Sequence, residues 1–193
     1  MNKYVALTGG IGCGKSVVAN IFSCMNVPVY NSDNRAKILM NTNQEIIRAL
    51  KDLIGEDLYK DSQLQKDVMS KNIFENADLL QKVNSIVHPA VWNDYVLWSK
   101  KQNSPFTIME TALLYETDLY KNFDKSIAVV ASDEIRIQRV MKRDNCSRES
   151  VVARIKNQTS VEKAVRNADF VIENNDTFVI PQVVEVYSQL NQK

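Results

Sequence analysis

Eight residues near the start of the chain could bind a phosphate group. Residues 9–16 read GGIGCGKS and fit the pattern G-x-x-x-x-G-K-[ST] in full. In such a loop, backbone N–H groups surround a phosphate, and glycines leave room for its approach. Lys15 would reach the β- and γ-phosphates of a nucleotide, and the hydroxyl of Ser16 would bind Mg²⁺. We therefore expect a nucleotide site in this segment, which we call the phosphate loop; the alternative is an ordinary glycine-rich turn.

A carboxylate suited to phosphoryl transfer follows a strand expected over residues 27–31. Such a transfer needs an acceptor hydroxyl in line with the γ-phosphoryl group and a carboxylate beside that hydroxyl. Asp33 lies just past the strand, in VYNSDNRAK. The carboxyl ends of neighbouring parallel strands face one crevice, so Asp33 would lie near the phosphate loop. We predict a catalytic role for Asp33; the alternative is that Ser32 or Asp33 caps the following helix.

Positive charge to neutralise the transferring oxygens is concentrated in residues 133–163, which hold eight basic and five acidic side chains. Arg136, Arg139 and Arg143 are spaced i, i+3, i+7 and share one face of a helix. An arginine stripe facing solvent is the alternative. We assign a lid role to Arg139 and Arg143 rather than to Arg136.

The elements that must position these residues alternate along the chain. Apolar, β-branched runs predict strands at 3–8, 27–31, 106–110, 126–131 and 170–173. Helical patterns separate them, which indicates an α/β fold with a parallel sheet and helices on both faces. Residues 32–104 show no strand pattern, and we expect a helical lobe there. Gly55 stands where a helix C-cap is expected.

Composition excludes several function classes. The chain has 193 residues, enough for one compact core with a lobe or lid, and its single histidine excludes a multi-histidine metal site. Its three cysteines lack Cys-x-x-Cys spacing, which argues against structural zinc and disulfides. The net charge of +1 argues against a general nucleic-acid binder, and no run reaches the roughly 20 apolar residues of a membrane span. We expect a cytoplasmic protein that binds neither nucleic acid nor membrane, with an oligomeric state that the sequence leaves open.

Two nucleotide-binding classes fit these residues, a switch protein and an enzyme that moves the γ-phosphoryl group. The D-x-x-G at residues 52–55 ends a helical pattern, and no N-K-x-D for guanine occurs. These observations favour a small-molecule kinase. A nucleoside or nucleotide kinase and a non-catalytic nucleotide-binding regulator remain the alternatives.

The ordered motifs of the chain resemble those of the dephospho-CoA kinase family. They are TGGIGCGKS at 8–16, Asp33, the pair His88-Pro89 after a helix, ALLYE at 112–116, QRVMKRD at 138–144, SRESVVARIKNQ at 147–158, Lys163, and Ala168-Asp169. The resemblance covers nearly the whole chain.

The resemblance implies a P-loop kinase fold with a five-stranded parallel sheet flanked by helices. Within one kinase domain over 1–193, it implies a nucleotide-binding core (1–31, 105–132 and 164–193), a helical substrate-binding lobe (32–104) and a lid (133–163). The implied reaction is ATP-dependent phosphorylation of the ribose 3′-hydroxyl of dephospho-CoA, giving CoA and ADP, the last step of coenzyme A biosynthesis.

The same resemblance assigns site residues by position. The implied nucleotide-binding residues are Gly9, Gly10, Ile11, Gly12, Cys13, Gly14, Lys15, Ser16, Val17 and Arg143. The implied catalytic residues are Asp33, Lys15 and Arg139, Ser16 is the implied Mg²⁺ ligand, and the implied substrate contacts are Thr8, Asp33, Lys37 and His88.

Some positions depart from the family pattern. Asn31-Ser32-Asp33 stands where Asp-Ala-Asp is usual, Lys37 replaces a common arginine, and Ala112 replaces a frequent proline. Glu110 either helps to hold Mg²⁺ through water or is an ordinary acid at a strand end. His88 either contacts substrate or ends a helix as a structural residue.

Overall fold

The computed structural model describes residues 2–74, 76–115, 118–156, 158, 161–176 and 178–192. It divides into two compact units, Met1–Asn31 with Lys100–Lys193, which we call the core unit, and Ser32–Ser99, which we call the helical unit. The helical unit ends five residues before the expected limit at 104. The expected lid segment, as far as it is described, belongs to the core unit.

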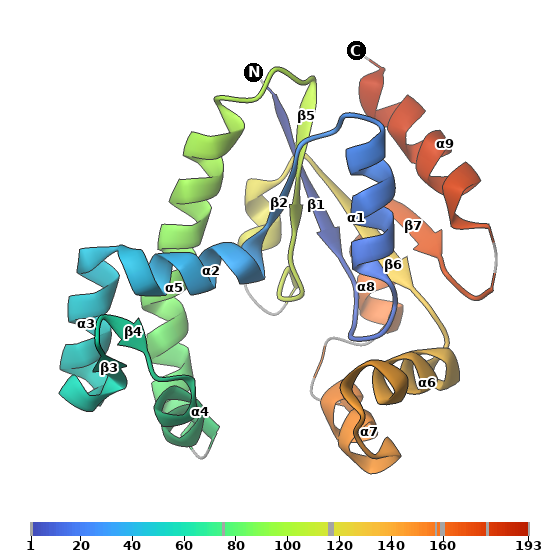
Figure 1. The fold of residues 1–193 in the computed structure, drawn as a ribbon. Helices are drawn as coiled ribbons and strands as arrows, with labels where there is room; N and C mark the ends of the chain where they lie inside the picture. The colour runs from blue at the N-terminus through green and yellow to red at the C-terminus, as the bar shows by residue number, and fades with distance from the viewer. Residues whose placement is uncertain are drawn as a thin grey trace. The chain divides into compact units, whose positions relative to one another are not determined.

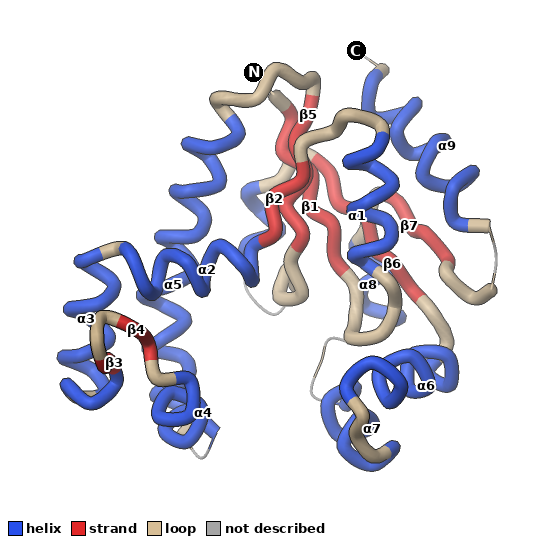
Figure 2. Tube along the Cα trace, viewed as in Figure 1, coloured by secondary structure: helices blue, strands red, loops and turns tan. Residues whose placement is uncertain are grey.

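A parallel sheet forms the centre of the core unit (Figure 1). Within the described residues it has five strands in the order β2-β5-β1-β6-β7, and neighbouring strands pair in parallel. The strands are β1 (Lys3–Thr8), β2 (Val29–Asn31), β5 (Phe106–Glu110), β6 (Lys125–Val130) and β7 (Phe170–Glu173). Figure 2 shows helices between successive strands of this sheet, which confirms the expected α/β fold.

The two helices α1 (Lys15–Cys24) and α9 (Val179–Asn191) pack against each other and against the sheet. Phe22 of α1 and Val183 of α9 are fully buried with Leu7 of β1 in one apolar cluster. Since β1 is buried at the sheet centre, the phosphate loop that follows it starts from a fixed point. The other helices of this unit are η2 (Asp118–Asn122), α6 (Asp133–Asp144), α7 (Arg148–Lys156) and α8 (Val161–Asn167).

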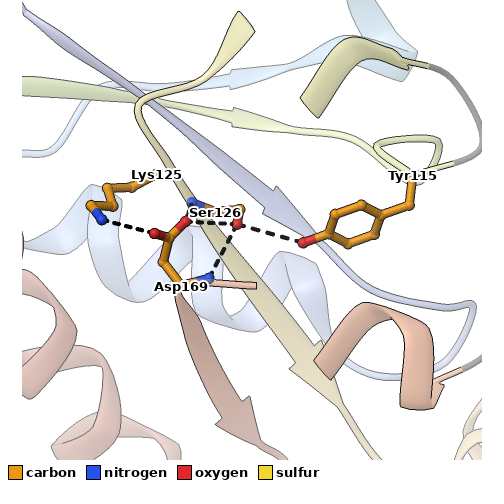
Figure 3. Close-up of polar contacts among 4 residues, drawn as sticks. All are labelled: Tyr115, Lys125, Ser126 and Asp169. Carbon is orange, nitrogen blue, oxygen red and sulfur yellow. Dashed lines mark hydrogen bonds and ion pairs between the residues drawn. The ribbon is translucent and has the colours of Figure 1, made fainter. Parts of the chain in front are cut away.

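A polar cluster joins the first residues of β6 to the residue before β7 (Figure 3). The Asp169 carboxylate accepts hydrogen bonds from the Ser126 backbone N–H (2.8 Å) and hydroxyl (2.9 Å) and pairs with Lys125 (2.8 Å). The Tyr115 hydroxyl approaches the Ser126 oxygen at 3.5 Å. Burial would raise the pKa of Asp169, but the hydrogen bonds from Lys125 and Ser126 outweigh it and lower that pKa. The cluster therefore fixes the register of edge strand β7 against β6.

The helical unit is built around one long helix, α5 (Ala77–Ser99), whose partners α2 (Ser32–Thr42), α3 (Gln44–Ile54) and α4 (Lys66–Phe74) pack on it (Figure 1). Arg35 of α2 pairs with Asp94 of α5 through two hydrogen bonds of 2.8 and 2.9 Å. Gly55 is the C-cap of α3, as expected.

Two expectations for the helical unit were wrong. A short hairpin of β3 (Tyr59–Lys60) and β4 (Gln63–Leu64) follows η1 (Glu56–Leu58). Strands of two residues are too short to leave an alternating pattern. Helix α5 also does not end at the His88-Pro89 pair but continues to Ser99. Proline removes one helical hydrogen bond, yet buried Val87 and Val91 hold the turns on both sides of it.

None of the helices that the structure describes is long and apolar enough to cross a bilayer.

Candidate functional site

The phosphate loop leads from β1 directly into the N-terminus of α1. Gly14 is the N-cap of α1, and Lys15 and Ser16 are its first two residues. The first N–H groups of a helix have no partner inside the helix, and they carry partial positive charge. The first turn of α1 holds no acidic residue. The local structure therefore suits an anion.

The loop glycines are required by their packing as well as by backbone angles. Gly12 and Gly14 have φ values of 79° and 92°, a region that other residues adopt at a cost. A Cβ on Gly12 would lie 2.6 Å from the carbonyl oxygen of Arg136, and one on Gly14 would meet the side-chain amide of Asn174. Packing against neighbouring elements therefore requires glycine at both positions, separately from the room that a bound phosphate would need.

Lys15 lies across the loop, where its Nζ donates to the carbonyl oxygen of Gly9 at 2.7 Å. Ser16 and Val17 are exposed, whereas Thr8 is buried at the end of β1. Cys13 is also buried, and this burial raises the pKa of its thiol, which nearby Lys15 only partly offsets. The Cys13 side chain therefore stays a neutral thiol at the base of the loop.

Helix α6 contacts the phosphate loop through Arg136, a residue to which the sequence assigned no such part. The Arg136 side chain is 4% exposed, and its Nε donates to the carbonyl oxygen of Ile11 at 2.9 Å. The Ile11 N–H donates in turn to the side-chain oxygen of Gln158 at 2.8 Å. Arg136 also pairs with Asp133 at 2.9 Å. Both backbone groups of Ile11 are thus held by side chains that follow β6 in the chain.

The Ile11 side chain packs in a small apolar cluster with Ile137, Val140 and Val151 of α6 and α7. This cluster, together with the Arg136 and Gln158 bonds, attaches α6 and α7 to the loop. The expected lid segment is therefore docked on the phosphate loop in this structure.

Arg139 lies one helical turn further along α6 and reaches the base of the loop. Its Nη2 donates to the Asn174 side-chain oxygen at 3.3 Å, and its Nη1 lies 4.0 Å from the place where a Cβ on Gly14 would stand. That Nη1 is buried and has no hydrogen-bond partner among the described residues. A buried, unsatisfied cationic donor beside a helix N-terminus suits an anionic ligand. Arg143 lies elsewhere: it is exposed at the end of α6 and pairs with Asp144.

Comparison with known proteins identifies the family. A family model described as Dephospho-CoA kinase matches residues 3–179. The chain belongs to the dephospho-CoA kinase family. A dephospho-CoA kinase of Bacteroides fragilis is 37% identical over 191 residues, covering 98% of this chain and 93% of the relative. One of Porphyromonas gingivalis is 36% identical over 191 residues, covering 98% and 95%.

Solved structures agree with this family fold. A Thermus thermophilus protein of known crystal structure has a TM-score of 0.88 and 25% identity, covering 100% of this chain and 99% of its own. A shikimate kinase of Acinetobacter baumannii, with a TM-score of 0.55 and 14% identity over 98% of this chain and 93% of its own, shares the fold alone. The P-loop kinase fold expected from the resemblance is thus confirmed.

Three residues that the dephospho-CoA kinase resemblance assigned belong to the helical unit. Asp33 and Lys37 are exposed, and Asp33 lies in the first turn of α2. Helix α2 begins at Ser32, so Asp33 is not its N-cap. His88 is half-buried inside α5, and this burial lowers its pKa. The substrate roles of these residues stay predictions.

At the end of the sheet, Asn31 of β2 donates its side-chain N–H to the Glu110 carboxylate of β5 at 2.8 Å.

Beside the phosphate loop, a small pocket is lined by Thr8, Gly9, Gly10 and Gln158 together with Ala112 and Tyr115. Two family motifs are incomplete in the structure, because Glu116 and Asn157 lie outside the described residues.

Proposed function

We propose that this chain transfers the γ-phosphoryl group of ATP to the ribose 3′-hydroxyl of dephospho-CoA, giving CoA and ADP. One observation in the structure carries the phosphoryl-transfer part of this proposal: the buried, unpartnered Nη1 of Arg139 next to the N-terminus of α1. A phosphate oxygen there would satisfy both the arginine donor and the free N–H groups of the helix. Family membership supports ATP as the phosphoryl donor and dephospho-CoA as the acceptor.

The transition state of this reaction spreads negative charge over the transferring oxygens. Lys15 would leave the Gly9 carbonyl and place its ammonium on the β- and γ-phosphates. Arg139 would donate from Nη1 to an oxygen of the transferring group. The Arg139 guanidinium is held by Asn174 before ATP arrives, so little reorganisation of this cation opposes the reaction.

Asp33 would accept the proton of the 3′-hydroxyl. It lies two residues after Asn31, the end of β2, and β2 pairs with β5, which itself pairs with β1. The side chain is exposed and therefore available to a substrate. It lies in the first turn of α2. Lys37, one turn further along the same helix, would neutralise anionic groups of the acceptor.

The residues present fit Mg²⁺, which usually binds one or two protein oxygens, phosphate oxygens and waters. Ser16 offers an exposed hydroxyl in the first turn of α1, and Glu110 offers a carboxylate at the end of the strand next to β1. When bound, Mg²⁺ would neutralise charge on the phosphates of ATP. The bond from Asn31 would hold the Glu110 carboxylate in place for such a role.

A coupled assay of ADP release tests the proposed function. Purified protein is given ATP and Mg²⁺ with dephospho-CoA, with a panel of nucleosides and nucleotides, or with no acceptor. We expect turnover with dephospho-CoA. Turnover that requires a nucleoside or nucleotide instead would identify another P-loop kinase, and nucleotide binding without any turnover would indicate a regulator.

Variants then test the assigned roles. Asp33→Asn should bind ATP normally and lose most turnover, whereas Asp52→Asn, an exposed carboxylate in α3, should behave as wild type. Lys15→Ala should weaken both ATP binding and turnover. Full activity of Asp33→Asn would contradict its role as the base.

A further inference from the structure

Asn174 is a buried polar residue whose position is fixed by the sheet. It directly follows β7, and its backbone N–H donates to the Val130 carbonyl oxygen at 2.8 Å, which extends the pairing of β6 with β7 by one residue. The residue is 9% exposed. Its side chain therefore projects from a rigid point at the carboxyl end of the sheet.

The Asn174 side chain connects the phosphate loop to α6. Its Nδ2 donates to the Cys13 carbonyl oxygen at 2.9 Å, and its Oδ1 accepts from Arg139 Nη2 at 3.3 Å. A Cβ on Gly14 would collide with Nδ2, so the amide lies directly against the loop. An amide is both donor and acceptor, and Asn174 uses both functions here.

The bond from Asn174 constrains the part of Arg139 that has no partner. A guanidinium group is planar and presents its N–H donors in a fixed fork. Holding Nη2 therefore limits where Nη1 can point, and Nη1 lies beside Gly14, at the N-terminus of α1. Without Asn174 the flexible stem of Arg139 would be free to turn this donor away from the loop.

We propose that Asn174 is a positioning residue for phosphoryl transfer, which holds the Arg139 guanidinium so that its free N–H donor faces the γ-phosphoryl group of the bound nucleotide. The inference rests on the proposed function only where kcat is measured, because that measurement needs the proposed acceptor. Asn174 itself is expected to touch neither substrate.

Two substitutions separate the two hydrogen bonds of Asn174. Asn174→Ala removes both, and we expect a tenfold to hundredfold lower kcat, roughly the effect of one lost bond to a charged group, with a smaller change in the KM for ATP. Asn174→Asp keeps an acceptor for Arg139 but places a carboxylate against the Cys13 carbonyl and near the phosphates. We therefore expect Asn174→Asp to raise the KM for ATP and to lower kcat less than Asn174→Ala does.

A double-mutant cycle tests whether Asn174 acts through Arg139. Asn174→Ala should lower kcat in the wild-type background and have no further effect in an Arg139→Ala background. An equal loss in both backgrounds would overturn the proposal, as would an Asn174→Ala variant with wild-type kcat. Asn175→Ala is the matched control, because its exposed amide accepts only the Ser132 N–H among the bonds that the structure records for it, and it should keep wild-type kcat.

A binding measurement tests the inference without any phosphoryl acceptor, so it does not depend on the identity of that acceptor. Affinities for ATP and ADP are measured by titration calorimetry, with thermal unfolding as the check on folding. The ratio of ATP to ADP affinity should fall to a similar extent in Asn174→Ala, Arg139→Ala and the double variant. If Asn174→Ala does not fold, Asn174→Asp alone decides, and an unchanged KM and kcat in that variant would refute the proposal. Absence of dephospho-CoA-dependent turnover in the wild type would refute the proposed function. The ratio of ATP to ADP affinity would still decide the inference about Asn174.

Discussion

Gly12→Ala should damage the attachment of α6 to the phosphate loop. The φ of 79° costs alanine about 1–2 kcal/mol. The new Cβ would lie 2.6 Å from the Arg136 carbonyl oxygen and 2.9 Å from Val140 Cγ2. The first obstacle is backbone, so α6 itself must shift, and such overpacking adds about 1–3 kcal/mol.

The expected total of about 2–5 kcal/mol should lower the melting temperature by roughly 4–20 °C in a protein of this size. Because α6 also carries Arg139, its shift should raise the Kd for ATP by roughly tenfold, the effect of one weakened bond to a charged group. Thermal unfolding followed by circular dichroism and titration calorimetry with ATP measure the two effects.

Gly55→Ala is the matched control for this prediction. Gly55 has a φ of 133°, so alanine is strained there too, at about 1–3 kcal/mol. Its Cβ would meet only the flexible end of Asp57, at 2.9 Å. The control should lower the melting temperature without changing ATP affinity. A Gly12→Ala variant with wild-type melting temperature and ATP affinity would refute the packing argument, and equal affinity losses in both variants would show that the effect is not local.

Other substitutions probe the contacts that hold the elements together. Arg136→Met keeps the side-chain volume but leaves the carbonyl on the phosphate loop unpaired, so thermal unfolding should report a loss of about 1–3 kcal/mol; an unchanged melting temperature would contradict the assigned bond. Asp169→Asn removes the ion pair with Lys125, which is worth at most about 1 kcal/mol at neutral pH. Because the fold lowers the pKa of Asp169 below 3.8, its contribution is present above that pH and is lost as the pH falls below it. The difference in melting temperature between wild type and Asp169→Asn should therefore be larger at pH 7 than at pH 3, and a constant difference would rule out this linkage. Asp94→Asn should destabilise the helical unit by about 1 kcal/mol and speed hydrogen exchange in α2, since it removes the negative charge and one of the two oxygens that accept from Arg35; unchanged exchange would show that the pair does not anchor α2.

The sequence predicted the sheet well because its central strands β1, β5 and β6 are buried on both faces. Continuous apolar runs placed β1, β5 and β7 at their observed bounds and β6 within one residue. The errors fell where tertiary contacts override a local rule. A proline usually ends a helix, but α5 continues through Pro89 because buried Val87 and Val91 hold the turns on both sides of it.

The site was predictable only where one short segment carries the whole signal. The phosphate loop is such a segment, and it was located from its spacing. The hydrogen bonds that support the loop join residues far apart in the sequence. Arg136 and Ile11 are separated by 125 positions, and Asn174 and Cys13 by 161. No local pattern connects such pairs. A polar residue directly after the edge strand was the available signal for Asn174, and its meaning depends on strand order.

Gly10 shows how far the composition of the phosphate loop is determined by other parts of the chain. Unlike Gly12, it has no positive φ, so its backbone would accept a side chain. What excludes a Cβ is the guanidinium of Arg136, with the Gln158 oxygen 3.2 Å away. A methyl group at position 10 should therefore be tolerated once the side chain at 136 is shortened. Positions 10 and 136 are accordingly expected to change together during evolution, and redesign of this loop has to treat them as one unit.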